Sequence, residues 1–209
     1  MSQGTNQSRE VPQYFDEAVH SMSHAAVRPG ISISDIRPPR NLAPLSHAVG
    51  LEVLHPELDP ESDQIPEYSL DHGGDAFGRL ILLHDPSSDE EWDGAKMRMV
   101  AYIQADMDAS LAADPLLPDV AWDWLTEELD SPESPFSNLG GTVTSTASVR
   151  YGEIGGPPRA FQIEMRASWT ATGSDLSGHV KAFSRVLANV AGLPPEGVTS
   201  IGSITQSAG

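Results

Sequence analysis

The 209-residue sequence contains no cysteine, few basic residues and no long apolar segment. Without cysteine the chain cannot form disulfides, thiolate metal sites or a cysteine nucleophile, and a cytoplasmic protein is the expected class. No apolar run approaches the roughly 20 residues that a membrane-spanning helix needs, so no membrane partner is expected. The first ten residues are polar and lack the apolar stretch of a secretory signal, so none is predicted.

Basic residues number 12 against 30 acidic ones, which gives a formal net charge of -18. Residues 57–133 contain 21 acids and three bases, whereas the rest of the chain contains nine of each, so one central stretch carries the whole net charge. Such a field repels the phosphates of nucleic acids and of anionic lipids, which argues against direct nucleic-acid binding. Cations and basic protein surfaces are the partners that such a field favours. The more common explanation of this composition is a solvated acidic face that keeps the protein soluble.

Apolar residues recur at helical or strand spacing along most of the chain, and this pattern predicts an α+β fold. Helices are expected over about residues 9–27 and 118–130, and from Ser174 or Asp175 to Gly192. Strands are expected at 51–54, 78–84, 96–105, 142–151 and 160–170, with the second pairing the third and the fourth pairing the fifth as hairpins. The order α-β-β-β-α-β-β-α predicts a mainly antiparallel sheet of four to six strands with three main helices.

The expected organisation is a single domain over residues 9–202, between disordered tails at 1–8 and 203–209. Residues 28–50 contain four prolines and three arginines, which predicts an extended or turn-rich connection with at most one short helical turn. Residues 55–77 contain seven acids, three prolines and no base, and this composition predicts a mobile acidic loop.

The predicted hairpin of residues 142–170 has the clearest alternation of apolar and polar residues. One strand is expected to bury Phe161, Ile163, Met165, Ala167 and Trp169. The other is expected to place Val143, Ala147, Val149 and Tyr151 on the same inner face. The polar residues between them predict an outer face that meets water, as antiparallel sheets allow.

The predicted helix at 118–130 separates acidic from apolar residues. Its acidic side spans about 80° of a helical wheel and forms the acidic stripe, which consists of Asp119, Asp123, Glu127 and Asp130. The apolar side holds Leu117, Val120, Ala121, Trp124, Leu125 and Leu129. Like charges four residues apart destabilise a helix by about 0.2–0.5 kcal/mol per pair, so burial of the apolar side must hold it in place. The stripe is the candidate partner-binding surface.

Asp16, His20 and His24 are spaced four residues apart in the predicted first helix, which places them on one side of it. Imidazole and carboxylate groups in this arrangement can hold zinc or nickel. The sequence has no His-Glu-x-x-His motif and assigns no fourth ligand, and a solvated helix face would show the same residues. We predict no cofactor, and these three residues are the candidate for a metal.

The motifs of several common enzyme classes are missing. The sequence has no Gly-x-Ser-x-Gly elbow, no Gly-x-x-x-x-Gly-Lys phosphate loop and no Gly-x-Gly-x-x-Gly turn, so no catalytic residue is assigned. Acidic pairs are numerous by composition alone, and sequence spacing does not show two of them sharing a pocket. Trp122, Trp124 and Trp169 either line a ligand pocket or pack in the core.

Two passages resemble the actinobacterial family catalogued as domain of unknown function 3000, over about residues 10–202. The first runs from Trp92-Asp-Gly94 through 96–106 to the segment 113–125, and the second joins Gly140-Gly-Thr142 to the segment 191–199. The resemblance implies no reaction, cofactor or catalytic residue. It implies genes that lie near a ribonuclease D-like gene, which points to partners in RNA processing. The order of elements is also similar to the secretion-chaperone-like and YbjN-type fold, whose small acidic members are dimers that bind proteins.

The sequence therefore favours a non-enzymatic protein-binding module, chaperone-like or regulatory, that presents the acidic stripe to a basic partner and forms a homodimer. The alternative is a metal- or carboxylate-dependent enzyme that acts on a small molecule. A third reading is an indirect role in RNA metabolism through a protein partner, because the nucleic acid itself need not touch this chain.

Overall fold

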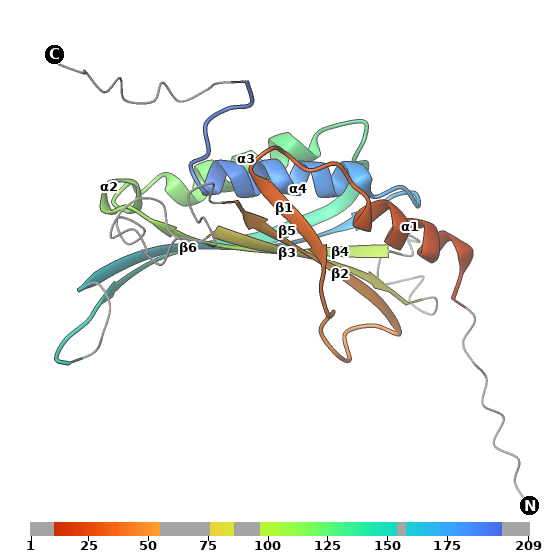
Figure 1. Ribbon diagram of the computed structural model, residues 1–209, viewed down its shortest axis with the longest axis horizontal. Helices are drawn as coiled ribbons and strands as arrows, with labels where there is room; N and C mark the ends of the chain where they lie inside the picture. The colour runs from red at the N-terminus through yellow and green to blue at the C-terminus, as the bar shows by residue number, and fades with distance from the viewer. Residues whose placement is uncertain (1–10, 55–75, 86–96, 154–157, 198–209) are drawn as a thin grey trace, which may run out of the picture.

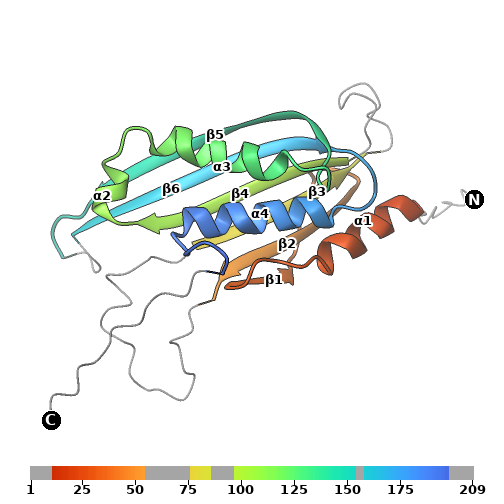
Figure 2. The ribbon, with the colours of Figure 1, turned by 90° about the horizontal axis from the view of Figure 1, so that it is seen from above.

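The computed structural model describes residues 11–54, 76–85, 97–153 and 158–197. Its helices are α1 (Gln13–Ser23), α2 (Ala109–Ala112), α3 (Leu117–Leu129) and α4 (Ser177–Val190). Its strands are β1 (Ile31–Asp35), β2 (Leu45–Val53), β3 (Ala76–His84), β4 (Met97–Met107), β5 (Phe136–Val149) and β6 (Arg159–Ala171). They form one six-stranded antiparallel sheet in the order β1-β2-β3-β4-β6-β5, which confirms the predicted α+β fold (Figures 1 and 2).

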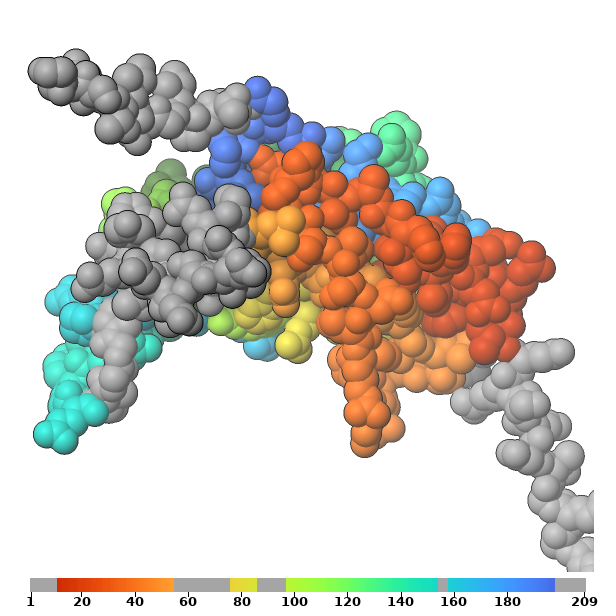
Figure 3. Space-filling model, viewed as in Figure 1, coloured from red at the N-terminus to blue at the C-terminus, as the bar shows by residue number. Residues whose placement is uncertain are grey.

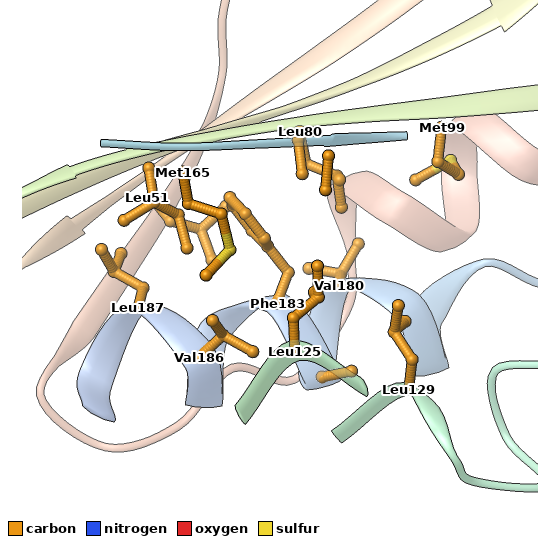
Figure 4. Close-up of a cluster of buried hydrophobic side chains, with 14 of the residues drawn as sticks. Leu51, Leu80, Met99, Leu125, Leu129, Met165, Val180, Phe183, Val186 and Leu187 are labelled. Atoms are coloured by element: carbon orange, nitrogen blue, oxygen red, sulfur yellow. The ribbon is translucent and has the colours of Figure 1, made fainter. Parts of the chain in front are cut away.

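The long helices α1, α3 and α4 lie on one face of the sheet, and the main core fills the space between the two layers (Figure 1). Strand alternation supplies one half of this core, because every second side chain of β3, β4 and β6 points toward the helices. Helix α4 supplies much of the other half, and Phe183 projects from it between Leu51, Leu80 and Met165 (Figure 4).

Glycine at position 78 makes room for Phe183. A Cβ atom at that place in β3 would lie 2.7 Å from the Phe183 ring carbon Cζ, which is closer than side chains pack. The close approach of helix and sheet at this point therefore depends on a strand residue that has no side chain.

The opposite face of the sheet carries none of the described helices, and we call it the helix-free face (Figure 1). A small apolar cluster on this face consists of Ala48, Ile81 and Leu83. Ile36 and Ala43, from the connection between β1 and β2, pack against it. The connection thus covers one end of the helix-free face, and no other described segment covers the neighbouring part of β3 and β4.

The prediction of a simple connection over residues 28–50 was wrong, because this segment contains β1 and most of β2. Its prolines lie before β1 and in the connection between the two strands, where none removes a ladder hydrogen bond. The predicted loop at 55–77 ends earlier than expected, since β3 begins at Ala76. Residues 55–75 and the predicted tails at 1–8 and 203–209 lie outside the described residues.

Both predicted hairpins form, as β3 with β4 and β5 with β6. The inner face of β6 is buried as expected except for a half-buried Phe161, whereas that of β5 is only partly covered. Val143 is half-buried, but Ala147, Val149 and Tyr151 are exposed, because the hairpin extends beyond α3 (Figure 2).

Among the helices of the described ranges, none has the length and apolar character needed to cross a membrane.

Candidate functional site

Helix α3 is held on the sheet by a single row of buried residues, Leu117, Ala121, Leu125 and Leu129. This spacing of four residues keeps one side of the helix against β5 and α4. The helix begins cleanly because Pro118 stands in the first turn and the Asp114 carboxylate accepts a hydrogen bond from the Leu116 amide at 2.9 Å. The orientation of α3, and so of its outer side, is fixed by this packing.

The acidic stripe lies on that outer side, and all four of its carboxylate residues are exposed. Within the described part of the chain none of them takes part in an ion pair. Their neighbours differ, since Glu128 pairs with Arg185 at 3.5 Å and Glu133 pairs with Lys181 at 3.0 Å. Bases are therefore present beside α3, but they neutralise other acids, and the charge of the stripe is left to solvent or to a partner.

Two apolar residues share the outer side of α3 with the stripe. Leu116 is 60% exposed and Val120 is 39% exposed. The wheel placed Val120 among the buried residues, and this was wrong, because the buried row is narrower than the apolar side of the helix. We call Leu116, Val120 and the acidic stripe together the α3 surface.

The three tryptophans of interest belong to the packing of the protein. Trp169 is completely buried, and its Nε1–H donates a hydrogen bond to Nδ1 of His179 at 3.2 Å. Trp122 and Trp124 are half-buried on the two flanks of α3 and pack against the core. Trp122 reaches Gly141 of β5, so the two sequence passages that carry the family resemblance meet in the fold.

Asp16, His20 and His24 are all exposed on α1 or at its end. The two imidazole rings stack with their centroids 4.1 Å apart, and His24 Nδ1 lies 2.9 Å from the carbonyl oxygen of His20. In the ranges that the structure describes, no three His, Asp or Glu side chains are grouped so as to hold a metal ion. The structure thus brings the histidines together without Asp16, and metal binding stays a prediction.

A second histidine cluster was not found from the sequence. Ser23 Oγ donates to Asp35 Oδ1 at 2.8 Å, and His47 Nε2 lies 3.2 Å from that hydroxyl and 3.5 Å from that carboxylate. Burial lowers the pKa of His47, and the Asp35 carboxylate opposes this. The serine and the aspartate face the same imidazole nitrogen, so the cluster lacks the relay of a Ser-His-Asp triad. It joins the end of α1 to β1 and β2.

The helix-free face contains a groove of about 1030 Å³ beside the β1–β2 connection. Strand register builds its floor, because Gly50, Arg79, Tyr102 and Arg166 are successive neighbours across β2, β3, β4 and β6. Phe77 lies next along β3 on the same face, with its ring centroid 6.0 Å from that of Tyr102. Arg37 and Glu52 line the groove from the connection and from β2.

The arginines of the helix-free face fall into two groups. Arg98 is held by hydrogen bonds to Ser168, Thr170 and the carbonyl oxygen of Asn138, and Arg166 pairs with Glu164 at 2.9 Å. In contrast, Arg37 and Arg79 are exposed and have no carboxylate partner in the described ranges. The guanidinium carbon of Arg79 lies 5.7 Å from the centroid of the Phe77 ring, which is the distance of a cation–π contact.

Tyr102 lies on the groove floor between Arg79 of β3 and Arg166 of β6. Its hydroxyl lies 2.8 Å from Glu164 Oε2 and 2.8 Å from Gln104 Oε1, and the Arg166 guanidinium carbon lies 5.7 Å from its ring centroid. Burial raises the pKa of this phenol, and the hydrogen bond to Glu164 raises it further. The phenol is therefore uncharged at neutral pH, and its ring is available on the groove floor.

Comparison with known proteins gives one match. The model of the family described as "Protein of unknown function (DUF3000)" matches residues 11–199. No curated protein and no solved structure matches the chain. The family resemblance seen in the sequence is thereby confirmed, whereas the looser likeness to the secretion-chaperone-like fold stays a prediction.

Proposed function

We propose that this chain, which belongs to the DUF3000 family, is a protein-binding module that uses the α3 surface. The description of the family assigns no activity, so the proposal is based on the geometry of the structure. The observation that carries the proposal is the row of four exposed carboxylates, which have no cationic partner among the described residues and share their side of α3 with exposed Leu116 and Val120. Exposed apolar residues beside charged ones are typical of a protein interface. A surface that only meets water has no reason to expose a leucine and a valine.

The spacing of charged and apolar residues on the α3 surface indicates what kind of partner would bind it. Carboxylates at intervals of one helical turn match Lys or Arg side chains at similar spacing, and the apolar pair matches one or two apolar residues beside them. We therefore propose a basic, amphipathic protein segment as the partner, in the cytoplasm that the absence of cysteine favours. Membership of the RNA-processing machinery and a homodimeric state are further parts of the proposal, which co-purification and light scattering respectively test.

Affinity capture from native cells, followed by rebinding of the purified partner, tests the proposal. Capture should weaken between 0.1 M and 1 M salt, since the Debye length falls from about 10 Å to about 3 Å. The variant Asp119→Asn, Asp123→Asn, Glu127→Gln, Asp130→Asn should lose the partner.

A matched control separates placement from net charge. The variant Glu61→Gln, Asp63→Asn, Glu67→Gln, Asp71→Asn removes the same four charges from the central acidic stretch and should retain the partner. If the stripe variant binds every purified partner as tightly as the control does, the α3 surface is not the interface and the proposal is wrong.

A further inference from the structure

We propose that the groove on the helix-free face binds a nucleoside phosphate, a small ligand that combines a flat ring with an anionic group. This site is separate from the α3 surface, which belongs to a helix on the other face of the sheet. Figure 3 shows that the β1–β2 connection (orange) and the far part of the β5–β6 hairpin (cyan) project on the helix-free side, with β3 (yellow) between them. The volume of the groove is of the size that small-molecule sites have.

The anionic group is inferred from the two arginines that lack a carboxylate partner. A chain with a net charge of -18 offers many carboxylates, yet Arg37 and Arg79 are paired with none in the described ranges. A guanidinium group forms bidentate hydrogen bonds with phosphate oxygens, and one phosphate has enough oxygens to bind two guanidinium groups. Arg166 lies one strand beyond Tyr102 and lines the same groove, but Glu164 already neutralises it. The phosphate is therefore assigned to Arg37 and Arg79.

The flat ring is inferred from Phe77 and Tyr102. Both side chains are only half-buried, although aromatic side chains of this size usually cover their faces, and both line the groove. Any of the nucleobases can stack on such rings, and stacking on an aromatic side chain contributes about 1–3 kcal/mol to the binding free energy. Glu52 adds an exposed carboxylate that can accept hydrogen bonds from the amino group or ribose hydroxyls of the ligand.

The charge of the whole protein decides between a mononucleotide and a nucleic acid. A polynucleotide would place many phosphates in the negative field of the chain, whereas a single nucleotide places its charge only against the arginines. The ligand is therefore a mononucleotide rather than an RNA strand.

Isothermal titration calorimetry of the full-length protein at 0.1 M salt tests this with AMP, GMP, CMP and UMP as probes. At least one should bind with one-to-one stoichiometry, and the corresponding nucleoside and inorganic phosphate should each bind at least about tenfold more weakly. Arg79→Gln and Phe77→Leu should each weaken binding about tenfold. Arg37→Gln should also weaken binding about tenfold. Because Arg37 lies in the β1–β2 connection and not in a strand, this variant tests the proposal even if a strand variant fails to fold.

Matched controls are available outside the groove. Arg159→Gln removes an exposed charge of the same kind from β6, and Tyr151→Leu removes an exposed aromatic ring; neither should change the affinity. The proposal is overturned if none of the four nucleotides binds at 1 mM, or if Arg159→Gln weakens binding as much as Arg79→Gln. Tenfold tighter binding of a ten-nucleotide RNA would also overturn it, in favour of a nucleic-acid surface. The stripe variant should bind nucleotide normally, so this test and that of the α3 surface fail independently.

Discussion

The two faces of the sheet differ in what covers them and in the charge around them. One face is covered by α1, α3 and α4, whose apolar sides pack on it. The outer side of α3 carries the acidic stripe, which forms no ion pair within the described residues. The other face has no described helix and carries half-buried rings, together with Arg37 and Arg79, which have no carboxylate partner in the described ranges. The net charge of -18 therefore describes neither face. The sheet separates a surface suited to cations from a groove suited to an anion.

The largest difference between the faces should appear in stability. Phe183→Ala removes a completely buried ring from the helix-covered face, and it should cost about 3–5 kcal/mol because the cavity cannot fill with water or neighbouring atoms. Phe77→Ala removes the same side chain from the helix-free face and should cost about 1 kcal/mol, since that ring is half-exposed. Urea denaturation measures both. Equal losses would mean that the helix-free face is covered as well as the other.

The helix-covered face should also make the protein sensitive to acid. Burial, opposed by Asp175 and by the Pro135 backbone, lowers the pKa of His179 to about 4. Between pH 6.5 and pH 4 the unfolded chain binds a proton at this residue and the folded chain does not, so stability falls as the pH falls. The loss between pH 7 and pH 5 should be about 2 kcal/mol.

The variant His179→Gln checks the source of this pH dependence. Glutamine keeps an acceptor for the Trp169 N–H but does not titrate, so the free energy of unfolding should lose that slope between pH 7 and pH 5. If the variant and the parent protein change in parallel, other groups cause the acid sensitivity.

Two adjacent glycines of β5 differ in their surroundings at the edge of the helix layer. At Gly141 a Cβ atom would collide with the Arg166 carbonyl oxygen and would lie 2.8 Å from the Trp122 ring, whereas at Gly140 it would meet nothing within 4 Å. Gly141→Ala should therefore cost about 1–3 kcal/mol, and Gly140→Ala should change stability by less than about 1 kcal/mol in either direction. Thermal unfolding of the two variants side by side measures this, and equal shifts would contradict the packing of α3 on β5.

The sequence predicted the elements whose periodicity is unbroken and missed those that depend on distant partners. Strand β6 was predicted almost to its ends, because its alternation is read along one segment. Strand β1 was missed, and only the end of β2 was predicted, at residues 51–54. The four prolines of residues 28–50 indicated a connection, whereas they lie before β1 and between β1 and β2. The acidic stripe was visible on one helical wheel, whereas the groove was not, since Arg79, Tyr102 and Arg166 become neighbours only through the register of three strands.

The smallest expected effect bears most directly on the role of the stripe. Asp123 has a like charge four residues away on each side, so Asp123→Asn should raise the free energy of unfolding by a few tenths of a kcal/mol to about 1 kcal/mol. Glu128→Gln, five residues along the same helix, should instead lower it by up to about 1 kcal/mol, because that carboxylate pairs with Arg185. High-precision urea denaturation at low salt measures both. A gain at Asp123 means that the stripe opposes folding, so its charge serves something other than stability; a loss there would mean that the stripe is structural and would remove the main argument for a binding surface.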